Sequence, residues 1–79
     1  MNHDWDTPMN PFYFVIARDT GNVIRVIQRD SRPVNTRALI HRSASIRHRD
    51  RYADFFATGR NLIHASQVLE DFNNSELQT

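Results

Sequence analysis

The sequence predicts an α+β fold in which a β-hairpin, or a three-stranded antiparallel meander, packs on a C-terminal helical hairpin. Two observations lead to this prediction. The stretch FYFVIARDTGNVIRVIQRD holds two runs of β-branched and aromatic residues around a glycine-containing turn, a pattern typical of a hairpin. From Ile46 onward the apolar residues recur at helical spacing instead, which indicates helices after the sheet.

The length of 79 residues fits a single domain. The first eleven residues contain two prolines, two aspartates and the lone Trp5, without a regular apolar period. We therefore expect residues 1–11 to form a flexible N-terminal arm, 12–74 a single small α+β domain and 75–79 a frayed C-terminal tail.

The hairpin turn decides which side chains share a face of the sheet. A three-residue loop at 19–21, with Gly21 in the left-handed conformation, would pair Ile16 with Ile24. We prefer it to a two-residue loop because a slip of one residue would turn the apolar set away from the core. The preferred register places these side chains on the core face: Phe12, Phe14, Ile16, Ile24 and Val26. The opposite face would carry these: Tyr13, Val15, Ala17, Val23, Arg25 and Ile27.

That opposite face is too apolar to be fully exposed. A monomer of this size seldom leaves a large apolar patch bare. We expect the N-terminal arm, a second copy of the chain or a partner protein to cover part of it.

Residues 37–46 allow two interpretations. Alternating apolar residues predict a strand, whereas Leu39, Ser43 and Ile46 at helical spacing predict a helix. We favour a third strand over 37–42, because two strands alone make a poor sheet.

Two helices are expected in the C-terminal half. The first starts at Ile46 and ends at Gly59, a residue type that favours the left-handed conformation just after a helix. The second is expected to be capped by Asn61. Its apolar residues follow heptad-like steps: Leu62, Ala65, Leu69 and Phe72.

The composition argues against catalytic and metal chemistry. The chain has no cysteine, which excludes disulfides and thiolate sites, and its four histidines match no metal-binding pattern. The serines and carboxylates form no nucleophile motif. We therefore expect no enzyme, no metal, no cofactor and no small-molecule substrate.

No apolar run approaches the ~20 residues that a membrane helix needs, and the N-terminus does not resemble a secretion signal. We expect a cytoplasmic protein without a membrane partner.

All ten basic residues are arginines, and four of them fall in the stretch HRSASIRHRDR, residues 41–51. Arg47 and Arg51 each precede an aspartate by three residues and are expected to pair with it on one helix. Arg42 and Arg49 have no such local partner. An alternative function is therefore nucleic-acid binding through an arginine-rich surface. The residues of that surface would be Arg25, Arg29, Arg37, Arg42, Arg47, Arg49 and Arg51.

A helix-turn-helix over 47–74 is a rival to this arrangement. Its second helix would end in Glu70 and Asp71, whereas a helix that enters a DNA groove carries basic residues. We therefore disfavour it.

The preferred function is protein binding. The chain would be a small non-enzymatic module that regulates or inhibits a macromolecular partner, by analogy of size with small phage and mobile-element proteins. Its partner would be another protein or a second copy of the chain. The expected binding residues lie on the poorly covered sheet face and the N-terminal arm, where an exposed tryptophan can anchor a partner. They are Trp5, Tyr13, Val15, Val23, Arg25 and Ile27.

Overall fold

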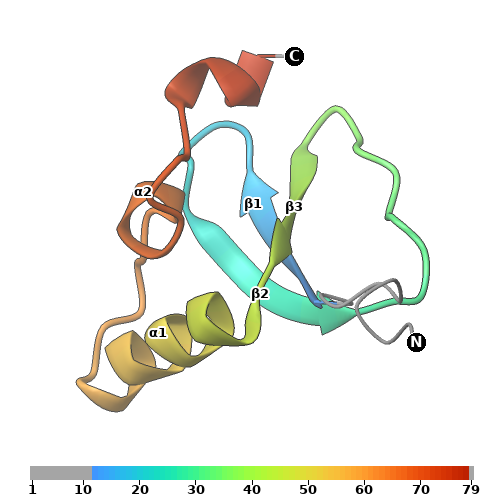
Figure 1. Ribbon diagram of the computed structural model, residues 1–79. Coiled ribbons are helices and arrows are strands. Elements are labelled where there is room, and N and C mark those ends of the chain that lie inside the picture. Colours follow the sequence, from blue (N-terminus) through green and yellow to red (C-terminus); the bar gives the residue numbers. More distant parts are fainter. Residues whose placement is uncertain (1–11, 79) are drawn as a thin grey trace.

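The computed structural model describes residues 12–78, and its centre is one antiparallel sheet of three strands (Figure 1). The strands are β1 (Phe12–Ala17), β2 (Val23–Gln28) and β3 (Leu39–Ala44). This confirms the α+β class and the third strand, which begins and ends two residues later than predicted. The strand order is β2-β1-β3, so β3 pairs with β1 and not with β2 as it would in a simple meander.

The hairpin register is confirmed for four residue pairs and wrong at the fifth. The confirmed pairs are Phe12–Gln28, Tyr13–Ile27, Phe14–Val26 and Val15–Arg25. The register then shifts, so that Ile16 pairs with Val23 and not with Ile24. This bulge exchanges the two β2 side chains between the faces. Val23 is 6% exposed and lies in the core, whereas Ile24 is 46% exposed.

The turn between these strands contains the predicted left-handed glycine. Gly21 has φ +78°, and its N–H donates to the carbonyl of Ala17 at 2.8 Å. The N–H of Ala17 in turn donates to the carbonyl of Asn22 at 3.0 Å. The loop therefore spans residues 18–21, one residue more than predicted, and the bulge absorbs the difference.

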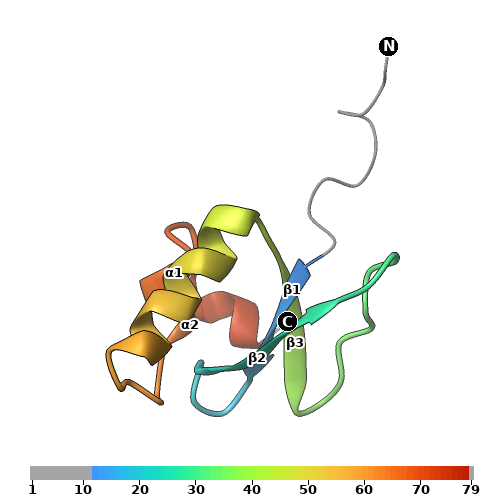
Figure 2. The ribbon, with the colours of Figure 1, turned by 90° about the horizontal axis from the view of Figure 1, so that it is seen from below.

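The helices cover one face of the sheet and the long connection 29–38 passes the other, as Figure 2 shows. The helical elements are α1 (Ile46–Ala57), α2 (Ala65–Val68) and the 3-10 helix η2 (Asn74–Gln78). No helix within the described part of the chain is both long and apolar enough to cross a membrane.

The first helix begins and ends where the sequence predicts. Ser45 is its N-cap: the hydroxyl accepts from the N–H of His48 at 3.2 Å, and His48 Nδ1 accepts from the N–H of Ser45 at 3.2 Å. This reciprocal pair satisfies two N–H groups that the first turn leaves without helical partners. After the helix, Gly59 adopts φ +90°.

The second helix is shorter than predicted and starts later. His64, not Asn61, is its N-cap. The residues before it are extended because they pair with the end of the hairpin: Ile63 accepts from the N–H of Val23 at 2.8 Å, and Ala65 donates to Gly21 at 2.8 Å. These bonds occupy backbone groups that a longer helix would have used internally.

The core lies between the sheet and the helices. Its buried members are Phe14, Ile16, Val23, Ile40, Ala44, Tyr52, Ile63, Ala65, Val68 and Leu69. Each large side chain in it contributes about 1.5–3 kcal/mol through burial. The ring of Tyr52 lies 5.6 Å from that of Phe14, which joins α1 to the central strand.

The C-terminal residues are held against the body of the domain. The sequence assigns 75–79 to a frayed tail, but η2 includes residues 75–78. Within η2, Leu77 packs against the core and Glu76 bonds to Arg42. Thr79 lies outside the described residues, as do residues 1–11 with Trp5.

Candidate functional site: a basic sheet face with an apolar pocket

The candidate site lies on the sheet face turned away from the helices, which we name the loop-side face. On β1 its side chains are Tyr13, Val15 and Ala17, which alternate with the core residues. Val15 pairs with Arg25 on one side and with His41 on the other, so these three form a row across the sheet.

The connection 29–38 is fastened to this face through the outer edge of β3. The side-chain oxygen of Asn35 accepts from the N–H of His41 at 2.8 Å and lies 3.2 Å from its Nδ1. The hydroxyl of Thr36 accepts from the N–H of Leu39 at 3.1 Å. These bonds satisfy edge groups that a bare strand would present to other chains. The connection 29–38 thus passes this face bonded to β3, whereas we expected the N-terminal arm, a second copy of the chain or a partner protein to cover it.

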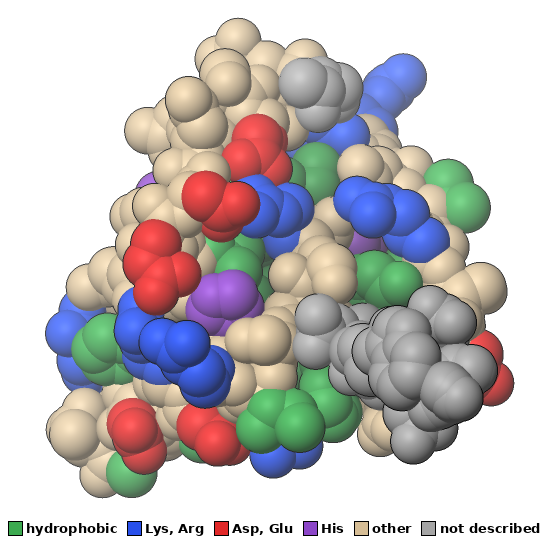
Figure 3. All heavy atoms as spheres, viewed as in Figure 1, with side chains coloured by type: hydrophobic (Ala, Val, Ile, Leu, Met, Phe, Trp, Pro, Cys, Tyr) green, Lys and Arg blue, Asp and Glu red, His purple; other side chains and the backbone are tan. Residues whose placement is uncertain are grey.

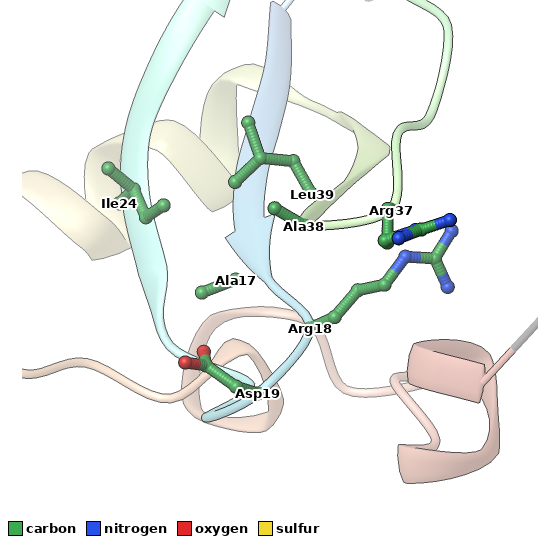
Figure 4. Close-up of a pocket in the computed structure, with 7 residues that line it drawn as sticks. All are labelled: Ala17, Arg18, Asp19, Ile24, Arg37, Ala38 and Leu39. Carbon is green, nitrogen blue, oxygen red and sulfur yellow. The ribbon is translucent and has the colours of Figure 1, made fainter.

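An open pocket of about 570 Å³ lies where the face meets the hairpin turn. Its lining consists of the apolar residues Ala17, Ile24, Ala38 and Leu39 and the charged residues Arg18, Asp19 and Arg37. Figure 4 shows Arg18 and Arg37 extending to one side of the pocket, with Asp19 on the turn at the other side. The bulge in β2 creates this pocket because it turns Ile24 away from the core.

The two arginines at the pocket differ in how firmly hydrogen bonds hold their side chains. Arg18 is fixed, since its Nε donates to the carbonyl of Thr36 at 2.9 Å and its Nη1 to the carbonyl of Leu77 at 2.9 Å. Arg37 is exposed and makes no hydrogen bond or ion pair within residues 12–78. It is therefore a cation that a ligand can reach.

Charge is divided unevenly between the two halves of the described chain. Residues 12–41 hold five arginines against Asp19 and Asp30, a formal charge of +3. Residues 42–78 hold five arginines against five carboxylates and are neutral. Figure 3 shows acidic and basic side chains intermingled over α1 and the C-terminal segment. The excess positive charge thus belongs to the β1–β2 hairpin and the connection to β3.

The arginine-rich stretch 41–51 is largely neutralised, contrary to part of the sequence analysis. Arg42, expected without a partner, bonds to Asp71 and Glu76 at 2.8 Å, and its side chain is only 20% exposed. The sequence could not show this pairing, because the two carboxylates lie about thirty residues further along the chain.

Two further arginines of α1 also differ from the expectation: Arg49 was expected without a local partner, and Asp50 was expected to pair with Arg47 instead. Arg49 lies 3.3 Å from Asp50, and Arg51 lies 3.3 Å from Glu70 of the C-terminal segment, not from Asp54. The pKa of Glu70 is lowered by its own backbone N–H, then by its hydrogen bond with His48, and also by the charge of Arg51. Of the proposed nucleic-acid set, Arg25, Arg29, Arg37 and Arg47 remain exposed without an acidic side-chain partner among the described residues.

The residues predicted to bind a partner are only partly brought together on the surface. Arg25 is exposed, and Tyr13 and Ile27 are half-buried on the loop-side face. Val15 is 2% exposed and Val23 belongs to the core, so both contribute to packing and not to an accessible surface. Trp5 lies outside the described residues.

Sequence reasoning missed Arg32, which the connection brings towards His41. The pKa of His41 is lowered mainly by burial, and the positive charges of Arg25 and Arg32 lower it further. Arg25 of β2 and Arg32 of the connection thus both act on the imidazole of His41. No pattern in the sequence marks this grouping, because it depends on how the ten residues of 29–38 cross the sheet.

Among the described residues, no three side chains of His, Asp or Glu lie close enough together to bind a metal ion. The three histidines in the described residues have structural roles: His48 and His64 cap helices, and the backbone N–H of His41 helps to hold the connection 29–38. Comparisons with protein-family models, curated proteins and solved structures give no match to this chain.

Proposed function

We propose that this protein is a small, non-enzymatic binding module that attaches to an acidic segment of another protein through its loop-side face and thereby regulates that partner. The observation that carries this proposal is the division of charge, +3 over residues 12–41 and neutral over 42–78. A surface of one sign attracts a partner of the opposite sign and orients it during association.

Nucleic-acid binding is the second candidate, and the same positive charge supports it. Affinity for a phosphate backbone depends on the number of arginines free to displace counterions. Arg42, Arg49 and Arg51 already face carboxylates of the chain. The pocket also lacks an aromatic ring on which a base could stack. These two observations favour a protein as partner.

The experiment that tests the proposal is selection from a displayed library of random peptides, with the purified protein as bait at low ionic strength. We expect enrichment of peptides rich in aspartate and glutamate. The double variant Arg25→Glu/Arg37→Glu should lose this enrichment, because it reverses two charges on the loop-side face. Arg47→Glu is the matched control, since Arg47 is exposed on α1 at the opposite end of β3 from the pocket.

Selection without acidic enrichment would contradict the proposal. Fluorescence anisotropy with labelled single- and double-stranded DNA provides the complementary measurement. Binding that weakens with salt at a log–log slope of about −3 would assign the positive face to nucleic acid instead, because such a slope corresponds to about three or four released counterions.

A further inference from the structure

We infer that the pocket at the hairpin end of the loop-side face receives one aliphatic side chain of the acidic partner segment, with a carboxylate of that segment next to it on the Arg37 side. This inference rests on the proposed function and specifies the chemistry of the segment: leucine, isoleucine, valine or methionine beside aspartate or glutamate.

The apolar part of the pocket supports the aliphatic group. Ile24 is 46% exposed at the bulge, and Ala17 and Leu39, which pair across β1 and β3, are half-buried beside it. Covering these surfaces removes apolar area from water, which is the main favourable term in association. The volume of about 570 Å³ falls within the range of ligand pockets, about 300–1,000 Å³.

The charged part of the pocket is asymmetric. Arg18 and Arg37 stand on one side and Asp19 on the other (Figure 4). Two bonds to backbone carbonyls hold the guanidinium of Arg18 in place, so its charge is fixed before a ligand arrives. A carboxylate on that side gains from both cations, whereas one beside Asp19 would be repelled. The asymmetry therefore requires an acidic residue on only one flank of the aliphatic one.

The test compares two synthetic peptides that differ at one position: a short glutamate-rich peptide with one central leucine, and the same peptide with serine in its place. Binding is followed by ¹H–¹⁵N NMR titration of the full chain. We expect the leucine peptide to bind about tenfold more tightly than the serine peptide, which corresponds to burial of one aliphatic side chain. The amide signals of Ile24 and Leu39 should shift with it.

The variant Ile24→Trp, which fills the pocket with a larger side chain, should reduce the preference for leucine to less than twofold and leave the binding of the serine peptide unchanged. Leu62→Trp is the matched control, because Leu62 is 72% exposed and is not part of the pocket lining. Ile24→Ala provides a second variant that removes the apolar wall without adding bulk. Dispersed NMR spectra of all three variants confirm that each is folded.

The outcomes separate the two proposals. Equal binding of both peptides would overturn the pocket inference and leave the acidic partner of the proposed function standing. Failure of both peptides to bind would overturn the two together. Concentration-dependent dimerisation that disappears in Ile24→Trp would show that the pocket binds a second copy of the chain. If the amide signals of the pocket residues shift with single-stranded DNA and not with the peptides, the pocket binds nucleic acid. Either result would overturn the inference.

Discussion

Arg42 of β3 donates from Nη1 to both carboxylate oxygens of Glu76, each at 2.8 Å, and so joins the sheet to the 3-10 helix at the end of the chain. Its Nη2 donates to Asp71 at 2.8 Å. An arginine that binds two carboxylates at once is held in one geometry, and such charge-assisted bonds are shorter and stronger than neutral ones. The most basic stretch of the sequence thus contains a structural ion pair at Arg42, which the alternative function assigned to nucleic-acid binding.

Replacing Arg42 by alanine is expected to lower the free energy of unfolding by about 2 kcal/mol, because three charge-assisted hydrogen bonds disappear and two carboxylates lose their partner. Urea denaturation of the purified variant measures this loss. Arg47→Ala is the control, since Arg47 is exposed and should change the stability by less than about 0.5 kcal/mol. Equal stability of the two variants would show that the bonds of Arg42 to Glu76 and Asp71 do not stabilise the fold.

Gly21→Ala is expected to destabilise the protein more than Gly59→Ala, although both glycines have positive φ, +78° and +90°. A Cβ at Gly59 meets nothing within 4 Å, so that variant should lose only about 1 kcal/mol through the backbone conformation. A Cβ at Gly21 would overlap Nε2 of His64. That ring is held by Ser66 and meets the ring of Phe72 edge to face, so we expect a loss of about 2–4 kcal/mol.

Thermal or urea unfolding of the two glycine variants provides the comparison, and a third variant identifies the cause. In a His64→Ala background the overlap is removed, and Gly21→Ala should then lose no more stability than Gly59→Ala does. If Gly21→Ala still loses more stability than Gly59→Ala in that background, the contact with His64 is not the cause.

The elements of this fold could be predicted from the sequence where their signals are local. The hairpin, the left-handed Gly21 and the whole of α1 follow from alternation, turn chemistry and caps that act within a few residues. The bulge at Ile24 and the shortening of α2 could not be predicted in this way. Both depend on backbone bonds between Gly21–Val23 and 63–65, which are about forty residues apart.

The candidate site was less predictable than the fold for the same reason. A one-residue bulge moved Val23 into the core and Ile24 onto the loop-side face, so the pocket could not be deduced from the expected register. The partners of Arg42 and Arg51 lie in the C-terminal segment, and their pairing depends on tertiary packing. Alternation correctly placed Tyr13 and Ile27 on the face opposite the helices, because that part of the hairpin keeps the predicted register.

The pKa of His41 is expected to lie below its ordinary value of 6.5, because burial and then the charges of Arg25 and Arg32 disfavour the protonated ring. Arg25→Gln should raise this pKa, since it removes one of the two nearby positive charges. An NMR titration of the His41 ring protons measures both values, with Arg47→Gln as a control that should leave the pKa of His41 unchanged. An unaltered pKa in Arg25→Gln would show that the two side chains do not interact.

This lowered pKa makes the stability of the protein depend on pH. The unfolded chain binds a proton at His41 more readily than the folded protein, so protonation favours unfolding. The contribution of His41 is complete above pH 6.5 and is lost as the pH falls from 6.5 through the folded pKa. We expect urea denaturation to give a lower free energy of unfolding at about pH 5.5 than at about pH 7.5. The difference between the two pH values should be smaller in Arg25→Gln than in the wild type.

Glu70 does not disturb this comparison, because its ordinary pKa of 4.5 is lowered and its effect on stability falls below this pH range. The same decline in Arg25→Gln as in the wild type would exclude the charge of Arg25 as a cause, and stability that rises towards pH 5.5 would mean that the folded protein binds the additional proton.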